Sequence, residues 1–114
     1  GTGTFENNQS YSIPDNNAAG ITSDIAVADI GNASTVSVEV DISHTYKGDL
    51  KVSLISPSGV NYILHNNSGG SANNIKKTYA VTLSGTDTTG TWQLKAVDSA
   101  SWDTGTINRW SMTF

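Results

Sequence analysis

Two histidines, His44 and His65, are the side chains of this sequence best suited to act as a general base, and neither stands in a catalytic pattern. Serine hydrolysis needs a nucleophile, a histidine base and an orienting carboxylate. The many serines lie in no Gly-x-Ser-x-Gly or Gly-Thr-Ser segment, and no His-Glu-x-x-His zinc motif is present. We expect His44 to pack or hydrogen-bond within the fold and His65 to face solvent at the end of a strand. The sequence therefore predicts a domain without a catalytic site.

Aspartates are the residues with the clearest potential for ligand chemistry. Asp98 and Asp103 lie in one polar loop, Asp49 ends a second loop, and Asp41 precedes that second loop. Calcium takes about six to eight oxygen ligands, commonly from carboxylates and loop carbonyls. We expect Asp49, Asp98 and Asp103, joined by Asp41, to form a calcium site that ties the two loops together. The alternative is that each aspartate caps its own turn by bonding to nearby backbone.

The three tryptophans divide into two kinds by their surroundings. Trp92 and Trp110 alternate with other apolar residues, which indicates core positions on strands. Trp102 lies inside the polar segment between Asp98 and Asp103, where a large apolar ring is unusual. Trp102 either covers the base of its loop or is exposed. If it is exposed, we expect it to form a docking patch with Tyr46 for another domain or a ligand.

The elements that must position these side chains are β-strands, and the clearest of them lie between residues 36 and 59. Valine or isoleucine occupies every second position from Val36 to Ile42, which is typical of a strand with one buried face. The same alternation returns in the segment from Leu50 to Leu54. The short polar connection HTYKGD separates the two segments, so we interpret them as an antiparallel pair of neighbouring strands. This pair is the predicted centre of the architecture.

Short alternating segments recur along the rest of the chain, with turn residues between them. They lie near residues 11–13, 21–27, 60–64, 79–83, 92–96 and 107–114. About eight strands without a convincing helix predict an all-β fold of two packed antiparallel sheets. The inward residues of the 60–64 segment are expected to include Val60. Residues 1–8 resemble a linker, and residues 65–74 form a polar loop for which the sequence predicts no order.

Composition limits the classes of partner. The 114 residues fit one domain, here expected over residues 1–114. Ten acidic against six basic residues give a net charge of −4 with no basic face, which argues against a nucleic-acid partner. No apolar run approaches the ~20 residues of a membrane-spanning helix, so no membrane partner is expected. The chain has no cysteine, which adds weight to a stabilising metal. The first residues lack the features of a signal peptide, so we expect a piece of a larger precursor.

Three segments also carry a resemblance to a known family. DISHTYKGDLKVSLISPSGV and GTWQLKAVDSASWDTGTINRWSMTF, together with the weaker YSIPDNNAAGITSDI, resemble in order the P domain, also called the Homo B domain. That module follows the catalytic domain of proprotein convertases and of many bacterial subtilisin-like proteases. The match runs from about Ile13 to Phe114. Beyond His44, Trp92, Trp110 and the four aspartates discussed above, the matching positions are Tyr46, Gly48, Leu50, Ser56, Pro57, Gly59, Gly90, Leu94 and Gly105.

The resemblance implies a jelly-roll β-sandwich, a choice that strand alternation alone cannot make. It further implies a non-catalytic accessory domain of a secreted bacterial serine protease, partnered by the catalytic domain of the same precursor. Such a domain would stabilise its neighbour and tune calcium dependence or substrate access. Two alternatives stay open. One is a module that binds insoluble protein substrate such as collagen, and the other is an accessory domain of a secreted zinc metalloprotease. Residues 75–90 are shorter here than in many bacterial members, so contacts made by such insertions are not carried over.

Overall fold

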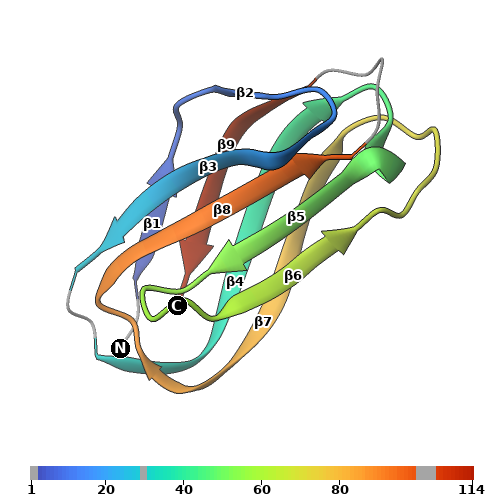
Figure 1. Ribbon diagram of the computed structural model, residues 1–114. Coiled ribbons are helices and arrows are strands. Elements are labelled where there is room, and N and C mark those ends of the chain that lie inside the picture. Colours follow the sequence, from blue (N-terminus) through green and yellow to red (C-terminus); the bar gives the residue numbers. More distant parts are fainter. Residues whose placement is uncertain (1–2, 29–30, 100–104) are drawn as a thin grey trace.

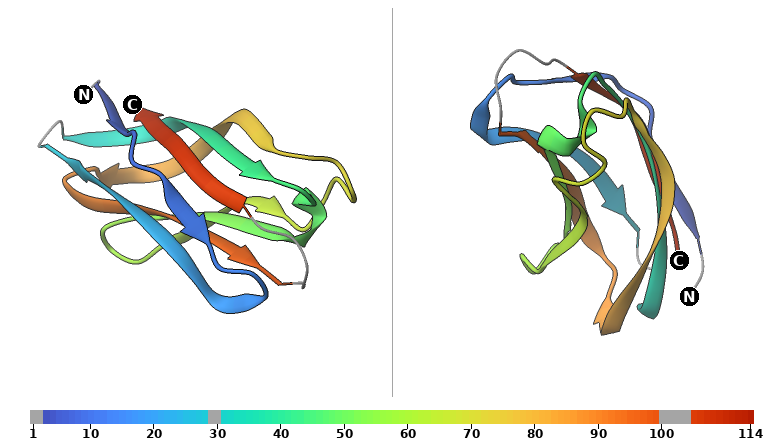
Figure 2. Two further views of the ribbon diagram at one scale, coloured as in Figure 1. Left: turned by 90° about the horizontal axis from the view of Figure 1, so that it is seen from above. Right: turned by 90° about the vertical axis from the view of Figure 1, so that its right-hand side faces the viewer.

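Two antiparallel β-sheets pack face to face around one apolar core in the computed structural model of the chain (Figures 1 and 2). The structure describes residues 3–28, 31–99 and 105–114. The strands are β1 (Thr4–Asn7), β2 (Tyr11–Ile13), β3 (Asn17–Val27), β4 (Asn32–His44), β5 (Leu50–Ile55), β6 (Asn61–Asn66), β7 (Ile75–Asp87), β8 (Gly90–Asp98) and β9 (Gly105–Thr113), with a short 3-10 turn η1 (Lys47–Asp49). The all-β prediction is confirmed. No helix in the described ranges is long and apolar enough to cross a membrane.

The strand order is that of a jelly roll. Sheet A has the order β1-β9-β4-β7, with β2 also paired to β9, and sheet B has the order β3-β8-β5-β6. Phe5 of β1 lies opposite Met112, and Tyr11 of β2 lies opposite Ile107 on the same partner strand. β1 and β2 therefore act as one interrupted edge strand, which reconciles nine strands with the eight expected. Residues 4–7, interpreted from the sequence as linker, belong to sheet A.

The interpretation of the two central strands as a hydrogen-bonded pair is wrong. β4 pairs with β7 and β9 in sheet A, whereas β5 pairs with β6 and β8 in sheet B. The connection through η1 therefore crosses from one sheet to the other. The buried faces of both strands, exemplified by Val38 and Leu54, meet across the core instead of lying edge to edge. Stacked sheets lie only about 10 Å apart, a span that six residues cover easily.

Both expected core tryptophans are fully buried and keep their indole N–H groups satisfied. Trp92 and Trp110 have 0% of their surface exposed. The Nε1 of Trp92 donates to the Thr88 carbonyl at 2.9 Å, and the Nε1 of Trp110 donates to the Ser23 hydroxyl, also at 2.9 Å. An indole buried without such an acceptor would lose the hydrogen bond that water supplies in the unfolded chain. The core prediction for these two residues is confirmed.

The loop after β6 is held against η1 by main-chain bonds that no sequence pattern announces. Lys47 N–H donates to the Ala72 carbonyl at 2.9 Å, and Gly48 N–H donates to the Gly70 carbonyl at 3.0 Å. A Cβ on Gly48 would lie only 2.8 Å from that Gly70 oxygen, so the close approach requires glycine. The two loops consequently form one layer at this end of the sandwich.

Val60 does not face inward with the β6 residues, as the alternation had suggested. It precedes the strand, and 47% of its surface is exposed. Its N–H donates to the Ser56 hydroxyl at 3.0 Å, and its carbonyl accepts from the Ser56 N–H at 2.9 Å. These bonds close the turn that carries Pro57, and turn geometry therefore overrides strand alternation at this residue.

Candidate functional site

A fully buried pair, His44 and Asp98, lies at the end of the sandwich where β4 and β8 finish. The His44 Nε2 is 3.0 Å from the Asp98 Oδ2, and neither side chain is exposed. The other ring nitrogen, Nδ1, accepts the backbone N–H of Tyr46 at 3.0 Å. In a neutral ring the proton therefore sits on Nε2, which donates it to the carboxylate. The pair links the two sheets, and the predicted structural role of His44 is confirmed.

The expected aspartates are only partly brought together. Asp98 lies opposite Leu50, so Asp49 and Asp98 share one end of the sandwich, and the Asp49 carbonyl accepts both the N–H and the hydroxyl of Ser99. Asp41 lies on the outer face of sheet A, where its carboxylate accepts from Asn108 at 3.1 Å. Asp41 therefore does not belong with Asp98, which points into the core.

Strand alternation in the sequence already predicts that Asp98 and Asp41 face opposite sides of their sheets, although the calcium prediction did not take this into account. Asp98 is in phase with Trp92 and Leu94 on its strand and must face inward, whereas Asp41 falls between Val40 and Ile42 and must face outward. Asp103 lies outside the described residues. Among the residues that are described, no three histidine or acidic side chains gather closely enough to hold a metal ion. The described donors alone do not make the expected calcium site.

The structure describes one of the two residues of the predicted docking patch. Tyr46 exposes 38% of its surface beside η1, whereas Trp102 lies outside the described residues. The expectation that His65 faces solvent is wrong, because only 9% of it is exposed. Its Nε2 lies 2.9 Å from the carbonyl oxygen of Lys47, and this contact holds the imidazole ring against η1.

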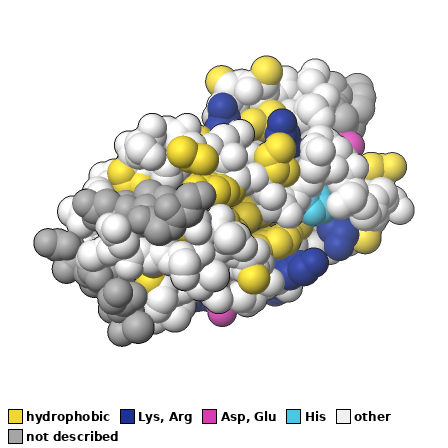
Figure 3. Space-filling model, turned by 90° about the horizontal axis from the view of Figure 1, so that it is seen from below, with side chains coloured by type: hydrophobic (Ala, Val, Ile, Leu, Met, Phe, Trp, Pro, Cys, Tyr) yellow, Lys and Arg dark blue, Asp and Glu magenta, His cyan; other side chains and the backbone are white. Residues whose placement is uncertain are grey.

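A hollow follows the open side of the sandwich, where β6 and β7 are the edge strands of the two sheets (Figures 1 and 3). We name it the edge groove. It consists of two hollows of about 460 and 440 Å³ that share Tyr79. The first is lined by apolar side chains, and Figure 3 shows hydrophobic atoms within the hollow with basic groups beside it. Its residues include Tyr62, Ile63, Leu64, Tyr79 and Val81.

The second hollow of the edge groove is basic. Lys47, Lys76 and Lys77 line it, which is half of the six basic residues of a chain with net charge −4. The Lys77 ammonium lies 5.2 Å from the centre of the Tyr79 ring, a cation–π contact that joins the basic end to the apolar end. Burial raises the pKa of the Tyr79 phenol. The groove thus combines apolar surface with positive charge.

Comparison with known proteins gives the class of this jelly roll. Residues 33–114 match the family described as the proprotein convertase P-domain, and the chain belongs to that family. P domains are non-catalytic accessory domains of proteases.

Individual relatives are bacterial proteases. The chain is 47% identical over 113 residues to leupeptin-inactivating enzyme 1 of Streptomyces exfoliatus, covering 97% of this chain and 26% of that protein. It is 43% identical over 116 residues to the transglutaminase-activating metalloprotease of Streptomyces mobaraensis, covering all of this chain and 15% of that protein. It is 44% identical over 93 residues to the calcium-dependent protease of Trichormus variabilis, covering 73% of this chain and 14% of that protein.

A solved structure supports the fold. The serine protease of Aeromonas sobria aligns with a TM-score of 0.74 at 17% identity, covering 97% of this chain and 27% of that one. The chain therefore spans about a quarter or less of each of these four proteins.

Proposed function

We propose that this chain is a non-catalytic accessory domain of a secreted bacterial protease, and that it packs through the edge groove against the catalytic domain of the same polypeptide. Membership of the P-domain family and a chain that covers 26% or less of its protease relatives support this role. The single observation that carries the docking step is the edge groove, because exposed apolar hollows of this kind usually mark interfaces.

The groove offers a partner both apolar area and charge. Ile63 exposes 52% of its surface in the apolar hollow, so covering it removes hydrocarbon from water on docking. The lysines of the basic hollow favour an acidic partner surface and fix its orientation. Stabilisation follows by mass action, because a domain that binds only the folded neighbour shifts that neighbour's unfolding equilibrium.

For the parent enzyme we propose a subtilisin-like serine protease, with a secreted zinc metalloprotease as the alternative. The Aeromonas sobria serine protease supports the first, and the Streptomyces mobaraensis metalloprotease supports the second. Reading the coding region before Gly1 separates them. A Gly-Thr-Ser segment indicates the serine protease, a His-Glu-x-x-His helix indicates the metalloprotease, and neither motif contradicts both.

Calcium linkage is a second candidate role, supported by the name of the calcium-dependent relative from Trichormus variabilis. The calcium ligands would come from Asp49, Asp103 and loop carbonyls more than from Asp98, because the Asp98 carboxylate is hydrogen-bonded to His44. A substrate-binding module is the third candidate, and adsorption of the isolated chain to insoluble collagen distinguishes it from a pure stabiliser, which stays in solution.

The docking step is tested with Ile63→Asp in the parent protease. We expect the melting temperature of the catalytic domain to fall toward that of a parent lacking residues 1–114, because the new carboxylate opposes burial of the hollow. Val60→Asp is the matched control, since Val60 is equally exposed but does not line the groove. The isolated chain should melt unchanged with either substitution. Equal melting of the parent with and without the domain contradicts the stabilising role. A stabilised parent that is insensitive to Ile63→Asp contradicts only the groove.

A further inference from the structure

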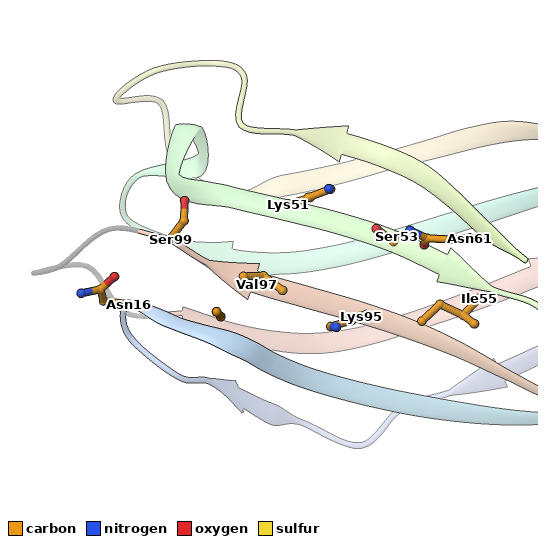
Figure 4. Close-up of a pocket in the computed structure, with 9 residues that line it drawn as sticks. Asn16, Lys51, Ser53, Ile55, Asn61, Lys95, Val97 and Ser99 are labelled. Atoms are coloured by element: carbon orange, nitrogen blue, oxygen red, sulfur yellow. The ribbon is translucent and has the colours of Figure 1, made fainter. Parts of the chain in front are cut away.

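The outer face of sheet B contains a separate cleft, and we infer that it binds the carboxylates of an acidic, partly apolar peptide segment in extended form. The cleft holds about 480 Å³. In Figure 4, Asn16 and Ser99 lie at one end, Ile55 and Asn61 lie at the other, and two lysines lie between them. This face points away from the core, and none of its residues belongs to the His44–Asp98 pair.

The lysines, Lys51 and Lys95, come from adjacent strands and sit diagonally across the sheet. Lys51 of β5 is opposite Val97, and Lys95 of β8 is opposite Ser53. Diagonal neighbours of an antiparallel pair are close enough for long side chains to interact. Both lysines are half-buried by the walls of the cleft. Two like charges that line one cleft repel each other, and an anion bound in the cleft relieves that repulsion.

The chain supplies no such anion from its described residues. Neither ammonium is within ion-pair distance of a described carboxylate, and the residues that line the cleft include no acid. Asp24 is on the same face, but it lies outside the lining and its carboxylate accepts the side-chain amide of Gln93 at 3.2 Å.

Arg109, on the outer face of sheet A, differs from these two lysines because it has acidic partners within the domain. The Arg109 guanidinium there lies 2.6 Å from a Glu39 oxygen and 3.5 Å from a Glu6 oxygen. The charge of Arg109 is therefore compensated within the domain, whereas Lys51 and Lys95 of the sheet B cleft have no ion-pair partner among the described residues.

A bulge in β3 builds one wall of the cleft. The pairing of β3 with β8 shifts between Asn17, opposite Asp98, and Ile21, opposite Ala96, so the segment between them is longer than its partner. Ala18 of this segment lines the cleft. The bulge depends on Gly20, which has φ +64°, and whose substitution by any larger residue would place a Cβ 2.4 Å from the Ala96 carbonyl oxygen.

The lining selects the ligand class. Ile55 and Val97 give the cleft apolar surface beside the lysines, and the amide of Asn61 can serve backbone N–H or C=O groups. An inorganic anion would bind to the lysines and leave the apolar side chains of the cleft exposed to water. A peptide with alternating carboxylate and aliphatic side chains uses both, since its side chains alternate at the spacing of a strand.

The test uses the labelled, end-blocked peptide Glu-Leu-Glu-Leu-Glu and measures its affinity for the chain by fluorescence anisotropy at low salt. We expect saturable binding, and we expect the double variant Lys51→Gln/Lys95→Gln to weaken it by about tenfold or more, since each lost charge contact is worth roughly 1 kcal/mol. The control compares two single changes that each remove one charge, Lys95→Gln in the cleft and Arg109→Gln on the outer face of sheet A; Arg109→Gln should bind as the wild type does. The thermal melts of all variants establish that they fold.

Four outcomes overturn the inference. One is the absence of saturable binding. Another is an equal loss of affinity in Lys95→Gln and Arg109→Gln, which would show that only net charge matters. The third is equal binding of the Gln-Leu-Gln-Leu-Gln peptide, which would show that the carboxylates are not recognised. Displacement of the acidic peptide by sodium sulfate at a similar concentration would reassign the cleft to simple anions.

Discussion

Replacing Asp98 with alanine tests whether the buried histidine–aspartate pair holds the two sheets together. The change leaves the Nε2 proton of His44 without its acceptor at a position that water does not reach. An orphaned buried donor costs about 1–3 kcal/mol, and breaking a buried charged pair costs about 3–5 kcal/mol. We therefore expect the free energy of unfolding to fall by about 3 kcal/mol, a large share of the ~5–15 kcal/mol of an ordinary domain.

The assay is urea unfolding followed by tryptophan fluorescence, which the two buried indoles make sensitive. Asp98→Asn is the matched control, because its amide oxygen keeps the shape and can still accept the Nε2 proton. It should lose about 1 kcal/mol. His44→Ala combined with Asp98→Ala should lose less than the sum of the two single changes, by about 0.5–3 kcal/mol, as residues in direct contact do. A loss below about 0.5 kcal/mol for Asp98→Ala, or strict additivity, would refute the coupling inferred from the 3.0 Å contact.

Three further changes test other parts of the structure. Gly20→Ala should lower the free energy of unfolding by about 1–3 kcal/mol, since the left-handed φ and the close Ala96 oxygen both oppose a Cβ; a melt like that of the wild type would contradict the bulge. Trp110→Phe should cost about 1–3 kcal/mol, partly by orphaning the Ser23 hydroxyl, and Ser23→Ala in the same background should recover some of that loss. Excess EDTA should lower the melting temperature of the calcium-loaded chain, because a ligand bound only to the folded state stabilises it; an unchanged melt rules out a stabilising calcium site.

Strand alternation predicted which side chains enter the core and failed to predict which strands are neighbours. The alternate apolar residues of segments 36–42 and 50–54 face inward as expected. Alternation fixes a face, but it does not name a partner, and the connection between these segments is long enough for a neighbouring strand or for the opposite sheet. The resemblance to the P domain implied the jelly roll, and this topology places the two strands in different sheets.

The candidate sites show the same division. The inward parity of Asp98 was readable from the sequence, and with it the contrast to Asp41, although its contact with His44 was not. The edge groove and the sheet B cleft depend on registers between strands that lie far apart in the chain. Lys51 and Lys95 become neighbours only because β5 pairs with β8. No local pattern carries that information.

The pairing of the first strand with the last determines how the domain responds to a mechanical load. Thr4 lies opposite Thr113, and the Phe114 N–H donates to the Gly3 carbonyl at 2.9 Å, so the two ends of the described chain lie side by side (Figure 2). A force that separates these ends acts across the strands and breaks the β1–β9 bonds one after another, as in opening a zip. A tension applied between the two ends would therefore detach β1 from β9 at low force. The core between the sheets would bear load only after that first strand had come off.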